Sequence, residues 1–580
     1  MRVFTGIAAS PGIVVGRLKV VDRRRVAVHE SAITVSDISV EAERLKSAVC
    51  QTRTELESLK KELEESTPDD HLFFIDTHLL ILSDERLVSE TSAIIESSLV
   101  NAEGALRRIL QKYRATFETI QDAYLRERIN DVETVIEKIL RTMSGETHAA
   151  IVPEAGMTVV AAHEITPADV LQMDRAQIVG MISEVGGKTS HASILARSFE
   201  LPAAVGVEGI ADPLLDGSPV ILDGLKGCVY VNPDRETFQE ILQRKQRYEY
   251  YELELQKLKD LPAETIDGHQ VWLKGNVELP EEAASVLRHG GTGIGLYRTE
   301  MVFMNRSEMP DEEEQFRMYT AMQQAVHPRP VTIRTLDAGG DKLLDGVAAM
   351  TEQNPAMGVR AIRLSLNMPD EFRKQLKAIL RASAFGEVRL MFPMISGLDE
   401  LRRAKQLLAE CMNDLENAGI AFDRGIRSGV MIEIPSAVSV ADLLASEADF
   451  FSVGTNDLIQ YTLAVDRTNE HLAAYYQPLH PAVLRSLKRV VDVAHAAGIE
   501  ACICGEMAGD PFYLPILLGL GFDELSMSAG SIPRVKQMLR RCTYRHTADV
   551  VAACMGLGTA REVEEYLNVQ ITGCLSESCD

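Results

Sequence analysis

The sequence has no apolar run of about eighteen residues, the length that a membrane-spanning helix needs. Its first residues, MRVFTGIAAS, also lack the basic segment followed by a long apolar stretch that marks a secretory signal. These two absences exclude membrane insertion and secretion from our interpretation. We expect a cytoplasmic protein.

Basic side chains are scarce relative to acidic ones. Sixty Lys and Arg residues stand against 85 Asp and Glu residues, which gives a formal net charge of -25. Because phosphate backbones are bound through clustered Lys and Arg, this balance argues against nucleic acid as the main partner. A basic protein partner is electrostatically favoured.

Cysteine is also sparse, and its nine copies are an odd number spread along 580 residues. This pattern fits neither a disulfide framework nor a zinc knuckle, so we expect reduced thiols. The sequence indicates no role for the two cysteines of the C-terminal tail. The nine are Cys50, Cys228, Cys411, Cys502, Cys504, Cys542, Cys554, Cys574 and Cys579.

What is present is typical of a soluble multidomain enzyme, with 46% apolar and 25% charged residues. Residues 1–20 have short strand-like patterns, residues 36–144 have long helical spacing, and short apolar runs return from residue 156. We therefore predict a helical module inserted into a small α/β domain. The predicted domains are 1–20 with 145–233 (α/β), 21–144 (inserted α-helical bundle), 234–260 (linker helix) and 261–580.

The last of these domains repeats one unit: a short apolar run, a polar residue at its end, then a helix. Eight such runs over about 300 residues predict a (β/α)8 TIM barrel. Catalytic groups of such barrels lie at the carboxyl ends of the strands. The runs are QVWLKGN, GIGLYRTE, VTIRTLD, VRLMFPM, GVMIEIP, FFSVGTND, EACICGE and ELSMSA.

Polar residues at these strand ends predict a site for a small, densely anionic ligand. Arg298 and Arg334, with Arg360 and Arg467 further on, offer guanidinium groups that bind phosphate or carboxylate. Asn276 also falls at a strand end. Each arginine taken alone is more often a surface ion-pair former, but their joint occurrence at one barrel mouth favours an anion site.

Three other residues at the same level suggest what the site does. Glu433 and Asp457 are hard oxygen ligands that suit Mg2+. The Cys504 thiol could deliver a proton to carbon, provided that its surroundings keep it protonated. Taken alone, Cys504 is more often a small buried hydrophobic residue.

A single histidine, His191, stands in GGKTSHASILAR between a glycine pair and a predicted helix. Most isolated helical histidines are structural. Here Gly186 and Gly187 allow close backbone approach, Thr189 and Ser190 supply hydroxyl groups, and the helix directs its free N–H groups at the site. These features favour an imidazole that carries an anion, such as a phosphoryl group, with Arg197 as a further neutralising charge.

GGKTSHASILARSFELPAAVG resembles the phosphohistidine motif of the phosphoenolpyruvate (PEP)-utilising enzymes, a family whose barrel motifs also follow in order. Those segments are GIGLYRTEMVFM, RTLDAGGDK, NPAMGVRAIR, MFPMI, IEIPSA, FFSVGTNDLIQYTLAVDR and CGEMAGD. The dikinases and synthases of this family carry an additional nucleotide-binding region, for which we expect no room here. The nitrogen-related variant has a sensory domain that we do not expect either. The chain is thus most similar to the Enzyme I branch of the bacterial sugar phosphotransferase system.

The resemblance implies a swivelling phosphohistidine domain and a role for each matching residue. It implies that His191 accepts a phosphoryl group with support from Thr189 and Arg197, and that Cys504 protonates the enolate to give pyruvate. It further implies Mg2+ as cofactor, bound by Glu433 and Asp457. The PEP-binding residues that it implies are Arg298, Arg334, Arg360, Lys342, Asn456 and Arg467.

The resemblance also implies partners: the histidine phosphocarrier protein HPr and, through the barrel, a second copy of the chain. For HPr we expect a docking surface on the inserted helices, in STPDDHLFFIDTHLLILSDE, where Asp69, Asp70, Asp84 and Glu85 are acidic. The same acids could equally form a solvated face.

The sequence departs from the family pattern in LLDGVAAMTEQ, residues 343–353, and at Ala356 and Val359 beside Arg360. Three other functions remain open at this point. A nucleotide-dependent dikinase would need a glycine-rich phosphate loop that we do not find. A metal-dependent enolate aldolase or lyase would leave His191 without a role, and a non-catalytic scaffold would leave the barrel mouth unexplained.

Overall fold

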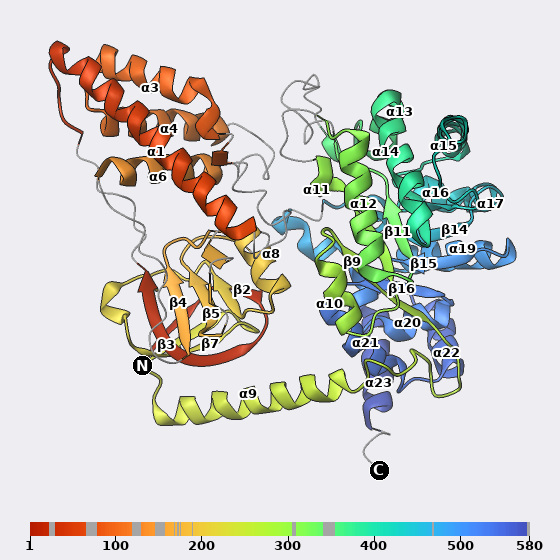
Figure 1. Ribbon diagram of the computed structural model, residues 1–580. Coiled ribbons are helices and arrows are strands. Elements are labelled where there is room, and N and C mark those ends of the chain that lie inside the picture. The colour runs from red at the N-terminus through yellow and green to blue at the C-terminus, as the bar shows by residue number, and fades with distance from the viewer. Residues whose placement is uncertain are drawn as a thin grey trace. The chain divides into compact units, whose positions relative to one another are not determined.

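The structure is a computed structural model in which the chain forms two compact units, Met1–Tyr250 and Tyr251–Asp580 (Figure 1). It confirms the predicted multidomain α/β class with a helical bundle and a TIM barrel. The structure describes residues 1–21, 30–64, 78–79, 81–118, 129–144, 157–166, 169–170, 173–174, 176–187, 190–303, 309–339, 354–466 and 469–576.

An eight-stranded sheet forms the centre of the first unit, in the order β1-β8-β7-β3-β4-β5-β6-β2. Strand β3 pairs in parallel with β4 and antiparallel with β7, so the chain leaves this sheet after Val21 and re-enters it beside the same strand at Thr158. Its strands are β1 (Arg2–Thr5), β2 (Ile7–Ser10), β3 (Ile13–Val21), β4 (Thr158–Ala162), β5 (Ile178–Ser183), β6 (Ala203–Val205), β7 (Pro219–Asp223) and β8 (Cys228–Val231).

Between β3 and β4, amphipathic helices pack around an apolar core of their own, which includes Leu45, Ile95, Leu106 and Ile136. A separate core explains how such a module can stand as an insertion, since it does not need the sheet to bury its apolar faces. The helices are α1 (Ile38–Glu64), α3 (Glu85–Ser98), α4 (Ala102–Glu118) and α6 (Ile129–Ser144).

The described residues of this unit include two further helices. Helix α8 (His191–Ser198) follows β5, and helix α9 (Arg235–Gln256) follows β8. The first turns of α9 pack Phe238 and Ile241 on Ile221 of the sheet, and Arg244 forms an ion pair with the buried Asp223.

The second unit is built on a closed barrel of eight parallel strands in the order β9 to β16. Each of the eight predicted runs overlaps one of these strands, so the prediction of the barrel is confirmed. The strands are β9 (Trp272–Val277), β10 (Ile294–Arg298), β11 (Val331–Arg334), β12 (Val388–Phe392), β13 (Arg427–Ile432), β14 (Phe450–Val453), β15 (Glu500–Ile503) and β16 (Glu524–Met527).

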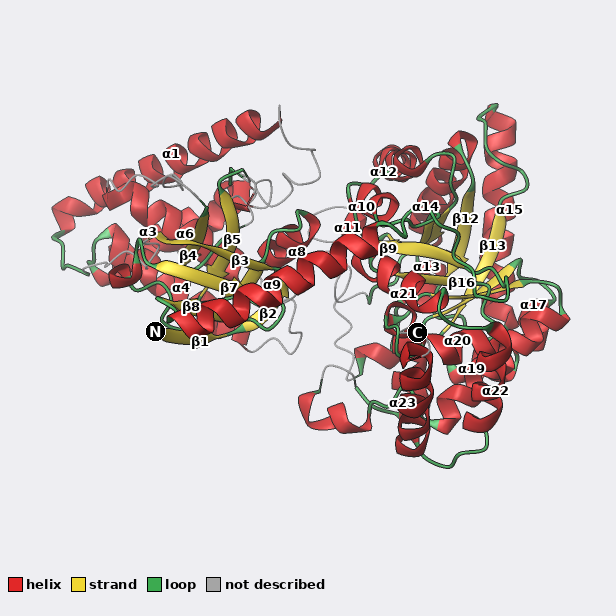
Figure 2. Ribbon diagram, turned by 90° about the horizontal axis from the view of Figure 1, so that it is seen from below, coloured by secondary structure: helices red, strands yellow, loops and turns green. Residues whose placement is uncertain are grey.

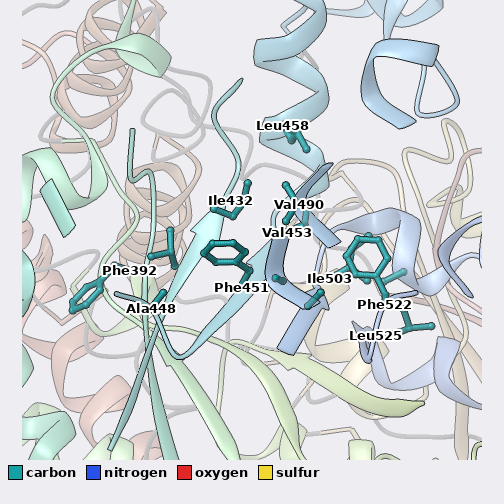
Figure 3. Close-up of a cluster of buried hydrophobic side chains, with 14 of the residues drawn as sticks. Phe392, Ile432, Ala448, Phe451, Val453, Leu458, Val490, Ile503, Phe522 and Leu525 are labelled. Carbon is teal, nitrogen blue, oxygen red and sulfur yellow. The ribbon is translucent and has the colours of Figure 1, made fainter. Parts of the chain in front are cut away.

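Helices surround this barrel, and α10, α12, α14 and α19 each pack against its strands (Figure 2). Apolar side chains from neighbouring strands, among them Phe451, Val453 and Ile503, meet Leu458 and Val490 from the helices (Figure 3). The helices are α10 (Glu282–Arg288), α11 (Glu300–Phe303), α12 (Glu312–Val326), α13 (Ala361–Asn367), α14 (Pro369–Ala382), α15 (Leu398–Ala418), α16 (Pro435–Ser439), α17 (Ala441–Ala445), α18 (Thr455–Leu463), α19 (Pro481–Ala496), α20 (Leu514–Leu520), α21 (Ile532–Leu539), α22 (Tyr544–Cys554) and α23 (Ala560–Ser576).

Within the described residues, no helix has the length and apolarity required to cross a membrane.

Candidate active site

Three carboxylates meet at the carboxyl ends of the barrel strands. Glu433 follows β13, Asp457 lies in the first turn of α18 after β14, and Asp337 follows β11. One oxygen atom of each lies within 4.8 Å of the others. Glu433 and Asp457 are predicted from the sequence, but Asp337 is not, although it follows its strand in RTLD as Glu433 follows its strand in IEIP.

Glu433 is buried among these carboxylates, and its pKa reflects their mutual repulsion. The side chain is buried and its Oε1 accepts a hydrogen bond from the Met394 N–H at 2.6 Å. Burial raises the pKa of Glu433 well above its ordinary value, and the charges of Asp337 and Asp457 raise it further, while Arg334 opposes the shift. Hard oxygen atoms that repel one another in this way are suited to a divalent cation such as Mg2+.

Arg334 is the buried cation beside the carboxylates. Its Nη2 donates to Glu300 at 2.8 Å and its Nη1 lies 2.8 Å from Asp337. Burial alone would lower the pKa of Arg334, but Glu300 and Asp337 raise it above the ordinary value. Its buried Nε has no hydrogen-bond partner among the described residues, so one donor remains for a ligand.

Arg360 joins the same network from the end of a loop. Its Nη2 donates to Asp337 at 2.8 Å and lies 3.5 Å from Asp457. Its Nη1 donates to the Tyr461 hydroxyl at 3.3 Å, and that hydroxyl in turn donates to the backbone carbonyl of Ala356. Burial opposes the charge of Arg360, yet the two aspartates raise its pKa. Ala356, one of the two atypical residues beside Arg360, is thereby linked to the network, whereas the atypical residues 343–353 lie outside the described residues.

Arg298 and Asn456 lie at the same end of the barrel with partners of their own. Arg298, the last residue of β10, donates from Nη1 to Glu278 at 2.8 Å, and its side chain is about 38% exposed. Asn456 accepts from the Glu506 N–H at 3.0 Å and donates to that residue's carboxylate at 3.3 Å. An anionic ligand would therefore compete with Glu278 for Arg298.

Cys504, which follows β15, is the buried thiol of the site. It packs with Leu296, Met391, Met431 and Phe450. Its Sγ lies 3.4 Å from the Ser452 hydroxyl. Burial raises the pKa of Cys504 to about 11, although Ser452 and Arg334 act in the opposite direction. The thiol thus stays protonated at neutral pH, as a proton donor must.

Asn276 fixes the backbone at this thiol, since its side-chain amide donates to the Cys504 carbonyl at 2.9 Å. The amide oxygen of Asn276 accepts from the Ser526 hydroxyl at 2.6 Å, which orients it.

His191 begins helix α8, which follows the glycine pair as the sequence predicts, and Ser190 is its N-cap. Gly186 has a φ of 116°, a conformation that L side chains rarely adopt, so glycine is required there. Arg197 lies on the same helix and donates to the Ala9 carbonyl at 2.9 Å. Among the residues predicted for phosphoryl transfer and PEP binding, Thr189, Lys342, Arg467 and the side chain of His191 lie outside the described residues.

Family models of PEP-utilising enzymes match three stretches of the chain. The N-terminal model matches residues 5–128, the mobile-domain model residues 155–227 and the PEP-binding-domain model residues 252–544. The chain is 42% identical to a phosphoenolpyruvate-protein phosphotransferase of Geobacillus stearothermophilus, with 98% of each protein covered. It is 41% identical to the protein of that name from Cupriavidus necator, over 92% of this chain and 93% of the relative.

Proposed function

Because the chain belongs to the PEP-utilising enzymes, among the phosphoenolpyruvate-protein phosphotransferases, we propose that its barrel mouth binds PEP and that His191 accepts the phosphoryl group. The observation that carries this proposal is the interlocked group of Asp337, Glu433 and Asp457 with two arginines beside a protonated thiol. Such a site matches a ligand with a phosphate, a carboxylate and a carbon that must gain a proton.

In the proposed site, Arg334 and Arg298 bind the phosphate of PEP, and Arg360 adds positive charge. Lys342, Asn456 and Arg467 are proposed from the family resemblance alone. Since Arg298 and Arg334 already contact carboxylates, ligand binding exchanges one set of anions for another, and the guanidinium groups are oriented beforehand.

The carboxylates Glu433 and Asp457 are the proposed Mg2+ ligands, and Asp337 lies close enough to join them. Bound there, Mg2+ would offset the negative charge that develops on the transferring phosphoryl group and on the enolate. The dense carboxylate group fits this cation because its like charges need a counter-ion.

In the proposed transfer, a ring nitrogen of His191 attacks phosphorus, an N–P bond forms, and the P–O bond to the enol oxygen breaks. The electron pair of that bond leaves with the enolate. The Cys504 thiol then gives its proton to the terminal carbon, which yields pyruvate. His191 and the barrel belong to different compact units, so transfer requires the two to come together.

We propose that phosphorylated His191 passes its group to the histidine phosphocarrier protein HPr, which docks on the inserted helices. Among the predicted docking acids, Asp84 is the N-cap of α3 and accepts from the Arg86 N–H at 2.9 Å. Asp69, Asp70 and the side chain of Glu85 lie outside the described residues.

The docking test therefore changes Asp69, Asp70 and Glu85 to Lys, while Asp84→Asn keeps the helix cap. We expect weaker carrier binding by calorimetry, with helicity unchanged. Unaltered affinity would remove the docking surface from the proposal without affecting the chemistry.

The central test incubates the chain with 32P-labelled PEP and Mg2+. We expect an acid-labile, base-stable label that His191→Ala abolishes, and stoichiometric pyruvate. Metal-dependent turnover without any label would instead support an enolate lyase and would contradict the transfer.

Two further proposals rest on the family resemblance: a cytoplasmic location and a homodimer that assembles through the barrel. Analytical ultracentrifugation tests the second, since one chain has a mass of 63.9 kDa. A single species at that mass at micromolar concentration would contradict it.

A further inference from the structure

His163 and Glu184 have no part in the chemistry described so far, yet they lie beside the segment that leads to His191. His163 follows β4 and Glu184 follows β5. These two strands are parallel neighbours, with Ala162 opposite Ser183, so the residues that follow them emerge at the same edge of the sheet.

The two side chains form a close polar contact. His163 Nδ1 lies 2.7 Å from Glu184 Oε2, and the exposed fractions of the side chains are 34% and 21%. A carboxylate oxygen only accepts hydrogen bonds, so Nδ1 carries the hydrogen and donates it. The other oxygen, Oε1, accepts from the Ala211 N–H at 3.0 Å. One carboxylate thus joins the segments that follow three strands, β4, β5 and β6.

The backbone reinforces this junction. The Glu184 N–H donates to the Ala162 and His163 carbonyls at 3.1 Å each, and the Val185 N–H donates to the His163 carbonyl at 3.0 Å. The Ser183 hydroxyl donates to the Val185 carbonyl at 2.7 Å. These hydrogen bonds therefore fix the backbone from Ser183 to Val185.

A short connection runs from this junction to the start of α8. The Gly187 carbonyl accepts from the Ser190 N–H at 3.1 Å and from the Ser193 hydroxyl at 2.9 Å. Ser193 is fully buried in the first turn of the helix, and the Ser190 hydroxyl accepts from its N–H at 3.3 Å. Displacement of Glu184 would be passed through Gly186 and Gly187 to the helix start.

We propose that His163 and Glu184 are a positioning pair that fixes the loop presenting His191 for phosphoryl transfer. The inference rests on the proposed function, in which His191 is the acceptor. Transfer between two groups depends steeply on their orientation, so an anchored loop raises the rate of the chemical step. PEP itself binds in the other unit, so the pair affects the rate constant of loading and leaves the affinity for PEP unchanged.

The experiment compares His163→Leu, which removes the donor, with His163→Gln, whose amide can still donate to Glu184. Loading of the full chain from 32P-labelled PEP is followed by rapid quench. We expect about a tenfold lower loading rate constant for His163→Leu with KM for PEP unchanged, and recovery of most of the rate in His163→Gln.

A matched control comes from the barrel, where His495 Nε2 lies 3.0 Å from Asp523 Oδ2 in a more exposed pair. His495→Leu removes a contact of the same chemistry elsewhere and should leave the loading rate unchanged. Thermal melting of every variant shows whether a slower loading rate comes from a displaced loop in a folded chain or from unfolding of the chain.

The proposal is overturned if His163→Leu loads at the wild-type rate, or if its loss only matches the fraction of unfolded chain. It is also overturned if His163→Gln recovers nothing. His191→Ala keeps the two proposals apart: a label that persists there contradicts the proposed function itself. A label that disappears there while His163→Leu loads normally contradicts only the positioning pair.

Discussion

Protonation of Cys504 depends on its surroundings. The thiol is enclosed by apolar side chains, so its ionised form loses solvation that the nearby Arg334 replaces only in part. The result is a pKa of about 11 rather than an ordinary thiol value near 9. A low-pKa cysteine would be a nucleophile, whereas this one is suited to donate a proton.

Replacement of Cys504 by Ala should therefore slow turnover without weakening substrate binding. We expect kcat to fall by about a hundredfold or more and KM to change little, because general acid catalysis contributes about that much. The control is Cys411→Ala, since Cys411 on α15 is also buried with a pKa of about 11. Steady-state kinetics of both variants give kcat and KM, and a raised KM with normal kcat for Cys504→Ala would refute the donor role.

The same pKa predicts how the thiol reacts with iodoacetamide. Only the thiolate is alkylated, and a pKa raised to about 11 keeps Cys504 in the thiol form at pH 8. We expect the exposed Cys50 to be modified at pH 8 while Cys504 is not, with modification of Cys504 appearing as the pH approaches 11. Peptide mass spectrometry measures both, and rapid labelling of Cys504 at pH 8 in folded protein would contradict the assignment.

At the scale of the element, the loops after the strands set the positions of the carboxylates. Glu433 leaves β13 and is held by the backbone of Met394, in the loop after β12. A Cβ atom on Gly454, directly after β14, would lie 2.7 Å from Glu433 Oε2. Glycine therefore keeps space for the carboxylate.

Gly454→Ala should displace Glu433 and weaken Mg2+ binding. We expect the Mg2+ concentration for half-maximal activity to rise about tenfold, as is typical when support for a metal ligand is altered. Gly530→Ala is the control, since a Cβ atom there meets nothing within 4 Å. Mg2+ titrations of both variants test this, and an unchanged requirement in Gly454→Ala would mean that Glu433 is not a ligand.

For the whole molecule, barrel closure joins β9 to β16, and a buried ion pair crosses this seam. Lys274 Nζ lies 2.5 Å from Glu524 Oε2, and both side chains are almost fully buried. Glu524 also belongs to a second acidic group with Glu500 and Cys502. Arg389 lies 2.7 Å from Glu500, so cations of the protein already neutralise this group. We interpret it as structural.

Glu524→Gln should destabilise the barrel, because it leaves Lys274 buried without its counter-ion. Removal of one partner of such a pair costs about 3–5 kcal/mol, whereas replacement of both by apolar residues is often close to neutral. Denaturant unfolding should thus show a large decrease in the free energy of unfolding for Glu524→Gln. The decrease should be smaller for the double variant that carries Lys274→Met and Glu524→Leu. Equal losses would indicate that packing, rather than charge, holds the seam.

Much of this architecture was accessible from the sequence, since all eight barrel strands were predicted from apolar runs. Glu433 after β13 and Asp457 after β14 were predicted because they lie at the ends of these runs. Asp337 and Glu300 were missed, as was Glu278 beside Arg298. The end of a strand shows that a residue lies at the barrel mouth, but it does not show which carboxylates its side chain contacts there. The contact of His163 with Glu184 was missed too, since the two residues are 21 positions apart in the sequence and meet only where their strands pair.

By itself, the sequence determined the local elements, the barrel and the residues able to carry charge or a proton. It could do so because apolar periodicity and residue chemistry are local properties. Only the tertiary structure decided that three carboxylates lie within 4.8 Å of one another, that Arg334 and Arg360 lie beside two of them and that Cys504 retains its proton. Those properties arise from burial and from distances between residues far apart in the chain, and electrostatic energy depends on both.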